Sequence, residues 1–386
     1  MGIPWRSPKL HVILASTLIG IMGVALLGPV LPTLKGVFTV SDAEVGLVLT
    51  AYTAPGILLA PFVGFVSDRV GRRRVLVPLL ALYGVAGASI VSAETFEQLV
   101  VLRFLQGVGA SSLITLAVTL IGDYYEGRRR GDIVSLNSGI IGVGAAIFPT
   151  LGGALVVLHW AAPFGFFGIA LLVALLALLV LDEPRVERTA SLSTYLRQFG
   201  SVVRDPQILG LYLAAVSTYV LFYGGVLTAI PLMLDGTYGL SPPQIGLLLA
   251  VSSVVSATVA TQNARLGDRA SVSTLLGGGF CAFGLAFLGI WLADSVAVIG
   301  GMLLVFGVGI GLTMPSIDRT LVGNVASSQR ASVLGLESSM IWLGQTIGPV
   351  LFPLLATDLF AAGGYVRLFF LFGSAATLGG LAVIVR

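Results

Sequence analysis

Two charged side chains lie inside long apolar stretches of the sequence, where an ionisable group is costly and usually serves a function. Glu337 lies near the start of the stretch 331–356, and Arg103 lies within the stretch 97–121. A carboxyl group held in a low-dielectric environment can keep and exchange a proton near neutral pH. Glu337 is therefore a candidate proton carrier. The alternative is that Glu337 is a gate partner for the loop after the second run or for a cytoplasmic arginine, and then Asp123 or a peripheral group would carry the proton, or none would. Arg103 has two possible surroundings. Its side chain faces a cavity or an acidic partner inside the protein, or it extends along the helix to the water at the membrane interface.

The sequence lacks the residue patterns typical of disulfides, metal sites, nucleotide-binding loops and catalytic triads. Cys281 is the sole cysteine, and the two histidines, His11 and His159, lie far apart, so the sequence contains no pattern typical of a disulfide or a metal site. Lys9 and Lys35 are the only lysines, and neither follows a glycine, so no phosphate-binding loop that ends in Gly-Lys is present. We find no nucleophile triad, and we expect neither an enzyme nor a bound cofactor or metal. The formal net charge of +3 is a weak argument for nucleic acid, and we expect no such partner.

The composition predicts that helices in a lipid bilayer hold these residues. The 386 residues are 56% hydrophobic and 10% charged, which is too few charges to cover a water-facing surface. A bilayer core needs about 20 apolar residues per helix. Apolar runs of about this length lie near 10–34, 43–66, 75–92, 97–121, 133–157, 161–181, 207–233, 243–264, 272–291, 295–317, 331–356 and 363–385. We therefore expect an all-α membrane protein with twelve transmembrane helices.

The charges between these runs predict an orientation. Loops after the even-numbered runs carry most of the arginines, as in 72–74 and 128–130, whereas the opposite loops carry mainly acids such as Asp42, Glu94 and Asp294. Solvated loops alone would also be polar, but the alternation from loop to loop follows the positive-inside rule. We expect a multi-pass protein of the cell membrane whose two termini face the cytoplasm.

An internal repeat divides the chain. Sliding the sequence by 200 residues aligns Asp68-Arg69 with Asp268-Arg269, and Pro149 with Pro349. A constant offset for such uncommon residues indicates two related halves. We expect a six-helix bundle over residues 1–182, a cytoplasmic linker over 183–206 and a second six-helix bundle over 207–386. These boundaries make the bundles parallel, pseudo-symmetric repeats.

The loop after the second run carries the most specific motif. It reads Gly64-Phe65-Val66-Ser67-Asp68-Arg69-Val70-Gly71-Arg72-Arg73-Arg74 and resembles the G-x-x-x-D-R-x-G-R-R/K signature of the major facilitator superfamily. Gly64 would allow close helix packing, Asp68 could bind the N-terminus of a facing helix, and Arg72 could pair with Asp123. Such a cluster would close the cytoplasmic side in one conformation. A topogenic basic loop without a gating role is the alternative.

Three further motifs are similar to those of the twelve-helix drug/proton antiporters in this superfamily. Residues 103–109 read Arg-Phe-Leu-Gln-Gly-Val-Gly, and the resemblance implies that Arg103 takes part in proton coupling. Gly23 precedes Pro29-Val-Leu-Pro32. The third motif comprises Gly144, Pro149, Gly152 and Gly153, with Phe148 where glycine is usual. We expect Phe148 to widen the packing of this helix locally, while an ordinary proline kink remains the alternative.

The resemblance implies a function. A member of this family would export small hydrophobic or amphipathic compounds in exchange for protons, by alternating access, as a monomer whose partners are the substrate and the bilayer. A proton symporter or uniporter for a sugar, organic acid or nucleoside is the alternative, and a sensor or scaffold that does not transport is a third. The family's cavity helices would place these candidate substrate contacts at the site, or else in ordinary packing: Tyr52, Gln106, Tyr219, Phe222, Tyr223, Trp342 and Gln345.

Overall fold

The computed structural model describes residues 3–184, 205–323, 325, 330–359 and 364–385, and the regular elements of this part are all helical. Twelve of its helical segments are long and apolar enough to cross a membrane, which confirms the expected fold class. Most of the predicted linker 183–206 lies outside the described residues.

The first half of the chain contains the helices α1 (Pro8–Ala25), η1 (Gly28–Val30), α2 (Leu31–Phe38), α3 (Asp42–Val70), α4 (Arg72–Ser89), η2 (Ile90–Ser92), α5 (Phe96–Ala110), α6 (Leu113–Tyr124), α7 (Gly127–Leu158), α8 (Ala162–Phe166) and α9 (Ile169–Val180). The second half contains α11 (Pro206–Val220), η3 (Leu221–Ala229), α12 (Ile230–Tyr238), α13 (Pro242–Gly267), α14 (Val272–Trp291), α15 (Val296–Gly323), α16 (Arg330–Leu354), η5 (Leu355–Leu359) and α17 (Gly364–Val385).

Several of the apolar runs are interrupted or leave regular α-helix. The first run breaks between α1 and α2, at Pro29 and Pro32, because proline lacks the N–H that would continue the helical ladder. The fourth run is interrupted between α5 and α6, at Ser111 and Ser112, and the seventh contains a π-helical segment, η3. In η3 the hydroxyl of Thr228 donates to the carbonyl oxygen of Tyr223 at 2.8 Å. Such local irregularities concentrate at functional sites in many helical proteins.

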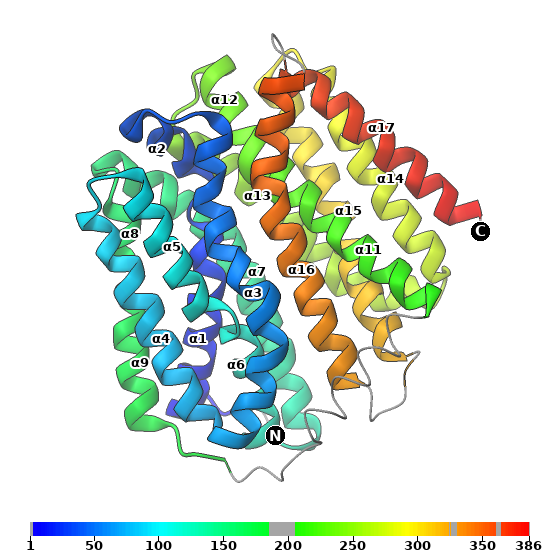
Figure 1. The fold of residues 1–386 in the computed structure, drawn as a ribbon. Helices are drawn as coiled ribbons and strands as arrows, with labels where there is room; N and C mark the ends of the chain where they lie inside the picture. The colour runs from blue at the N-terminus through cyan, green and yellow to red at the C-terminus, as the bar shows by residue number, and fades with distance from the viewer. Residues whose placement is uncertain (1–2, 185–204, 324, 326–329, 360–363, 386) are drawn as a thin grey trace.

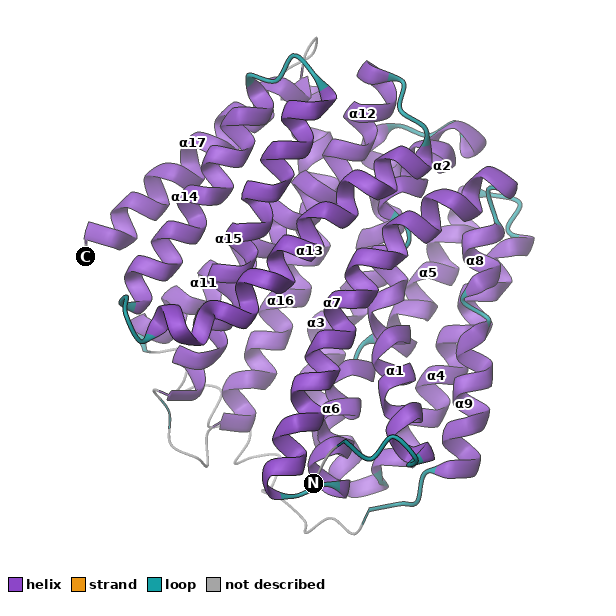
Figure 2. Cartoon of the chain, turned by 180° about the vertical axis from the view of Figure 1, so that it is seen from behind, coloured by secondary structure: helices purple, strands orange, loops and turns teal. Residues whose placement is uncertain are grey.

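The two halves stand side by side, with α1–α9 in blue to green and α11–α17 in green to red (Figure 1). The same division is visible from behind (Figure 2). We call the end that carries the loops at 70–72 and 125–127 the arginine-rich end, and the end that carries the loops at 39–41 and 239–241 the opposite end. The N-terminal helix starts at the arginine-rich end.

The halves meet along two seams, one between α3 and α16 and one between α7 and α13. Near the opposite end both seams are so tight that glycine is required. A Cβ on Gly46 would overlap the carbonyl oxygen of Pro349, and a Cβ on Gly246 would overlap that of Pro149. The same pair of positions, separated by 200 residues, therefore makes the equivalent backbone contact on both seams. Small residues allow this approach of helices in lipid.

Candidate functional site

Two chambers that share lining residues lie between the halves. The upper chamber has a volume of about 380 Å³ and is enclosed by α1, α3, the α5–α6 junction and α7 on one side and by α11, η3, α13 and α16 on the other. The lower chamber has a volume of about 790 Å³ and is lined by α7, α11, α13 and α15. Tyr219 and Phe222 line both chambers. The lower chamber lies towards the arginine-rich end, since its walls include Ser135 near the start of α7 and Thr261 near the end of α13.

Contacts between the halves seal the upper chamber from the opposite end. Along α3 and α16, the hydroxyl of Thr50 donates to the carbonyl oxygen of Thr346 at 2.7 Å, and the hydroxyl of Thr346 donates to that of Thr53 at 3.0 Å. Further along this seam the ring of Trp342 lies against Gly56, and this ring also lines the chamber. At the outer end of the seam, the hydroxyl of Tyr365 donates to the carboxylate of Asp42 at 2.7 Å.

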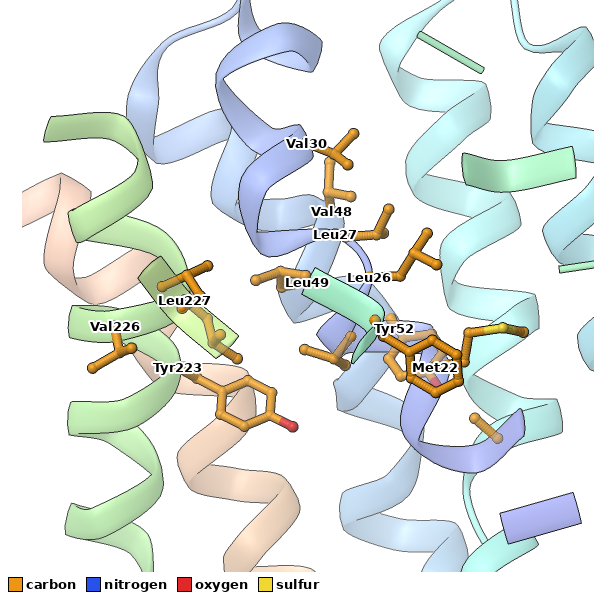
Figure 3. Packing of buried hydrophobic residues seen from close by; sticks show 14 of the residues in the cluster. Met22, Leu26, Leu27, Val30, Val48, Leu49, Tyr52, Tyr223, Val226 and Leu227 are labelled. Atoms are coloured by element: carbon orange, nitrogen blue, oxygen red, sulfur yellow. The ribbon is translucent and has the colours of Figure 1, made fainter. Parts of the chain in front are cut away.

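Six of the seven predicted substrate contacts line the upper chamber. They are Tyr52, Tyr219, Phe222, Tyr223, Trp342 and Gln345. Figure 3 shows the Tyr223 side chain projecting from the second half towards the helix that carries Leu49 and Tyr52. The seventh, Gln106, does not line this chamber in this conformation, since it is fully buried behind the wall and accepts a hydrogen bond from Arg103 at 2.7 Å.

The wall of the upper chamber combines aromatic rings with uncharged polar groups. Its polar members beside the tyrosines and Gln345 include Ser111, Ser112, Ser253 and Ser338. Among the described residues, the lining of this chamber contains no charged side chain. Such a wall suits a ligand with a large apolar surface and a few hydrogen-bonding groups.

Arg103 lies directly behind this wall and is 0% exposed, so it does not extend to water at the end of its helix. Its Nε donates to the carbonyl oxygen of Val48 at 3.0 Å, and its Nη2 donates to that of Gly23 at 2.8 Å. The guanidinium also lies over the ring of Tyr52, 4.2 Å from the centroid. In this conformation, therefore, Arg103 joins α1, α3 and α5 through carbonyl oxygens, and it touches the chamber through the Tyr52 ring.

The arginine-rich loop makes the predicted ion pair. The Nε of Arg72 lies 3.1 Å from Oδ2 of Asp123, and the guanidinium also pairs with Asp68 and donates to Ser67 Oγ at 2.7 Å. Gly71 adopts a φ of 116°, which a residue with a side chain rarely takes, so it permits the turn into α4. All of these partners lie in the first half.

Two details of this loop differ from the expectation or go beyond it. No neighbour lies within 4 Å of a Cβ built on Gly64, so the expected close helix packing there is wrong in this conformation. The sequence also gave no reason to single out Glu183, whose carboxylate accepts hydrogen bonds from the backbone N–H groups of Arg73 and Arg74, both at 3.3 Å. These bonds satisfy two free donors at the start of α4.

In the partial copy of this motif, at residues 268–269, the aspartate is more exposed to solvent than in the first copy. Asp268 and Arg269 are both exposed, and their backbone N–H groups close the end of α13 by donating to Ala264 and Leu266. In the first copy, Arg69 lies over the ring of Phe65, 3.6 Å from the centroid. The two loops therefore differ in their contacts although they share an Asp-Arg pair.

The third motif places neighbouring glycines against different halves. A Cβ on Gly152 would overlap the carbonyl oxygen of Leu26 in the same half, whereas a Cβ on Gly153 would overlap that of Pro242 in the other half. A Cβ on Gly144 would meet Ile21 at 2.8 Å and the Phe148 ring at 3.1 Å. The ring of Phe148 thus folds along its own helix and is buried. The expected widening is not seen, because α7 still closely approaches α13 beside it.

A pair of carboxyl groups lies in the second half. Glu337 on α16 is 4% exposed, and its carboxyl group interacts electrostatically with that of Asp318 on α15. The Oε1 atom of Glu337 is buried and has no hydrogen-bond partner. Asp318 is exposed and lines the lower chamber.

The structure does not bring the three predicted proton-coupling residues together. Arg103 and Asp123 lie in separate clusters of the first half, and Glu337 lies in the second. Sequence reasoning missed Asp318, because the predicted run 295–317 ended one residue before it. The signal was present, since Thr320, Leu321, Val322 and Gly323 continue the helix after the charged pair Asp318-Arg319.

The comparisons with known proteins agree with the helical architecture. The family model described as Major Facilitator Superfamily matches residues 13–240 and again residues 215–386. A bacillibactin exporter of Bacillus subtilis is 27% identical over 359 residues, which cover 87% of this chain and 87% of that protein. The multidrug efflux protein YfmO of the same organism is 27% identical over 376 residues, covering 95% and 88%.

A solved structure shows the same fold at low sequence identity. It is a bacterial homologue of the human lysosomal transporter Spinster, in an inward-facing and unoccupied conformation. The TM-score is 0.78 at 16% identity, and the match covers 100% of this chain and 96% of that one.

Proposed function

The chain belongs to the major facilitator superfamily, and from that premise we propose that it exports small amphipathic compounds across the cell membrane in exchange for protons. The observation that carries the proposal is the chamber between the halves, with its aromatic wall, beside a buried carboxyl group in the second half. The relatives at 27% identity are named as exporters of bacillibactin and of drugs, which supports the outward direction.

The substrate would bind mainly in the upper chamber. Flat apolar surfaces come from the rings of Tyr52, Tyr219, Phe222 and Trp342. Gln345 and the serines of the wall are uncharged groups that can form hydrogen bonds. Because apolar burial contributes about 25 cal/mol per Å² and is not directional, such a wall accepts ligands of different shape. This favours a hydrophobic or amphipathic substrate over a sugar, whose many hydroxyls would each need a partner.

The conformation corresponds to one state of an alternating-access cycle. Both seams are closed at the opposite end, while the lower chamber extends towards the arginine-rich end. By the positive-inside rule the arginine-rich end faces the cytoplasm, so we assign this state as open to the inside and ready to load substrate. Export then requires the seams to open and the arginine-rich end to close.

Glu337 would carry the coupled proton. An ionised carboxylate at this site would be a buried charge without a cation among its described contacts, which costs several kcal/mol. A neutral carboxyl group avoids this cost, so we assign the protonated form to the conformation seen here. A change of conformation that exposes Glu337 to the outside, or a bound cationic group, would alter its protonation and so couple the two fluxes.

Transport in proteoliposomes tests the proposal. The purified protein is reconstituted with ethidium as the probe, and its movement is followed after a pH gradient of either sign is imposed. We expect ethidium to move against the proton flux, and we expect Glu337→Gln to lose this driven movement while it keeps ethidium exchange without a gradient. Glu97→Gln, an exposed acid at the start of α5, is the control.

Two results would contradict the proposal. Movement of the substrate together with protons would favour the symporter alternative, and ethidium binding without any exchange would favour a sensor or scaffold. Driven transport by Glu337→Gln at the wild-type rate would remove Glu337 from the coupling.

A further inference from the structure

The fourth membrane span is broken near its middle. The 29-residue span Phe96–Tyr124 contains α5, which ends at Ala110, and α6, which begins at Leu113. Between them, Ser112 has a φ of −146° and a ψ of 13°, which lie outside the helical region. The helix α6 therefore begins inside the membrane-spanning part of the protein and not at its surface.

The start of α6 has backbone donors that its own helix does not use. The first bond of this helix runs from the N–H of Leu116 to the carbonyl oxygen of Ser112, at 2.8 Å. The N–H groups of Leu113, Ile114 and Thr115 precede this bond, so they have no acceptor within α6. The residues Ser112, Ile114 and Thr115 line the upper chamber. The chamber therefore meets the positive end of the α6 helix dipole.

The side chain of Ser112 is also unused. Serine at the position before a helix usually accepts a hydrogen bond from an N–H of the first turn, but Ser112 makes no such bond. It is 2% exposed, and its Oγ is buried without a hydrogen-bond partner. The adjacent Ser111 differs, because its hydroxyl donates to the carbonyl oxygen of Val108 at 2.9 Å. A buried polar group normally has a partner, so the Ser112 hydroxyl points to a ligand at the chamber wall.

A second unused hydroxyl lies next to this turn. Tyr52 lines the same chamber, is 1% exposed, and its hydroxyl is buried without a hydrogen-bond partner. This hydroxyl packs against Gly23 of α1, where an added Cβ would overlap it. Ile114 of α6 packs against Gly20, where a Cβ would lie 2.7 Å from Cγ1. Because Gly20 and Gly23 share one face of α1 within a single turn, the Tyr52 hydroxyl and the start of α6 are neighbours.

The buried charge of Arg103 acts on the same part of the chamber. Its described hydrogen bonds go to two backbone carbonyl oxygens and to the side-chain oxygen of Gln106, none of which carries a full negative charge. The guanidinium lies over the ring of Tyr52, 4.2 Å from the centroid. A charge in a low-dielectric interior is screened much less than in water. Arg103 and the α6 dipole therefore both favour a negative group at this wall.

We propose that the first turn of α6 and the hydroxyls of Ser112 and Tyr52 form a subsite for a carboxylate, so that the preferred substrates are amphipathic molecules that carry one. This inference rests on the proposed function, because it takes the upper chamber as the place where the substrate binds, and it names the chemical class that the chamber selects. The hydroxyls and the backbone N–H groups donate to the carboxylate oxygens, which need several donors when they leave water. Arg103 supplies the balancing positive charge behind the Tyr52 ring.

The charges of the two chambers give the direction of such a ligand. The lower chamber is lined by Asp318, which repels a carboxylate when it is ionised, whereas the described lining of the upper chamber contains no charged side chain. The carboxylate therefore lies in the upper chamber at α6. The apolar body of the ligand extends past Tyr219 and Phe222, which line both chambers.

Binding of two matched probes tests the subsite. The probes 1-pyrenebutyrate and 1-pyrenebutyramide share a ring system and a chain, and they differ in a carboxylate against a neutral amide. Titration calorimetry of the purified protein in detergent, with protein-free micelles as the blank, gives a Kd for each. We expect the wild type to bind the carboxylate at least about tenfold more tightly than the amide, because hydrogen bonds to a charged acceptor are the stronger ones.

Two substitutions at one position separate the hydroxyl from the charge. Ser112→Ala removes the donor and should weaken pyrenebutyrate binding about tenfold, with a smaller effect on the amide. Ethidium carries no carboxylate, so its Kd should not change in this variant. Ser112→Asp keeps a residue that favours the start of a helix, so α6 should fold, but it places a negative charge where the carboxylate binds. We expect this variant to lose pyrenebutyrate binding and to bind the ethidium cation more tightly.

Thr119→Ala is the matched control on the same helix. The Thr119 hydroxyl donates to the carbonyl oxygen of Thr115, and Thr119 is absent from the described lining of both chambers. This variant should bind all three probes like the wild type. An equal loss of ethidium and pyrenebutyrate binding in Ser112→Ala would show that the residue shapes the wall without recognising the carboxylate, and it would overturn the subsite.

The remaining outcomes separate this inference from the proposed function. Equal Kd values of the two pyrene probes in the wild type, or no binding of either, would also overturn the subsite. If a pH gradient drives ethidium while the carboxylate preference is absent, the proposed exchange stands and this inference fails. If the preference is found but neither ethidium nor pyrenebutyrate crosses the proteoliposome membrane, the exchange fails while the subsite stands.

Discussion

The closed seams make a quantitative prediction about the conformational equilibrium. Alanine at Gly46 and Gly246 places a Cβ against the carbonyl oxygens of Pro349 and Pro149, which belong to the other half. Overpacking of this kind costs about 1–3 kcal/mol per site. The gain in helix propensity, about 1 kcal/mol for glycine to alanine, is the same in every conformation that keeps these helices and so cancels.

Each substitution should therefore shift the ratio of closed to open seams. With a tenfold change for every 1.4 kcal/mol, the cost corresponds to about 5- to 150-fold per site towards the state open at the opposite end. The clash disappears when the halves separate at this end, so the protein should remain folded. Gly36→Ala is the matched control, because nothing lies within 4 Å of a Cβ there.

Spin-label distances measure this shift. The background is Cys281→Ser, which removes the one natural cysteine. One label pair, Val37→Cys and Thr237→Cys, joins α2 to α12 at the opposite end, and a second, Gly131→Cys and Thr261→Cys, joins α7 to α13 at the arginine-rich end. We expect the first distance to lengthen and the second to shorten when Gly46 or Gly246 is replaced.

The reasoning has a clear refutation. Unchanged distances in both alanine variants, or an equal shift in Gly36→Ala, would show that the glycine contacts do not control the closed state. Gly152→Ala offers a further contrast, because its Cβ would overlap Leu26 within one half. It should lower the melting temperature without moving the distance distributions.

Three further predictions follow from named contacts. Tyr365→Phe removes the hydrogen bond to the Asp42 carboxylate across the seam. Hydrogen bonds to charged groups contribute about 1.5–3 kcal/mol, so the closed seam should lose this stabilisation. The distance between spin labels at positions 37 and 237 should therefore lengthen in a measurable fraction of molecules. Arg103→Ala leaves buried carbonyl oxygens of α1 and α3 without their donor. Each unsatisfied group costs about 1–3 kcal/mol of folding free energy, so thermal unfolding in detergent should begin at a clearly lower temperature. An unchanged melting curve would contradict the role of this residue in joining the helices. Lys9, through a hydrogen bond and its charge, lowers the pKa of Asp182 below the ordinary 3.8. The stabilisation is therefore present above that pH and is lost as the pH falls through the lowered pKa. The small difference in melting temperature between Lys9→Met and the wild type should vanish in strong acid and in high salt.

Much of the site's location was predictable, but its chemistry was only partly so. The signature loop indicated the Arg72–Asp123 pair, which lies at 3.1 Å, because the motif fixes residues on adjacent helix ends. Six of seven substrate candidates line the chamber, since the helices that enclose it are common to the family. Gln106 lies outside the lining of this chamber, which the sequence could not show because a pattern gives the helix of a residue but not the direction in which its side chain points.

The sequence by itself determined the number of membrane spans, the family and the alternation of charge, because transfer from water to lipid depends on each residue's own chemistry and is additive along a run of about 20 residues. Tertiary structure alone decided that Glu337 interacts with Asp318, that Arg103 binds carbonyl oxygens, and that Gly152 and Gly153 contact different halves. These outcomes depend on the rotation and crossing of helices, which brings together positions as far apart as 46 and 349. A rotation of one residue, 100° on an α-helix, would exchange such partners without changing hydropathy at all.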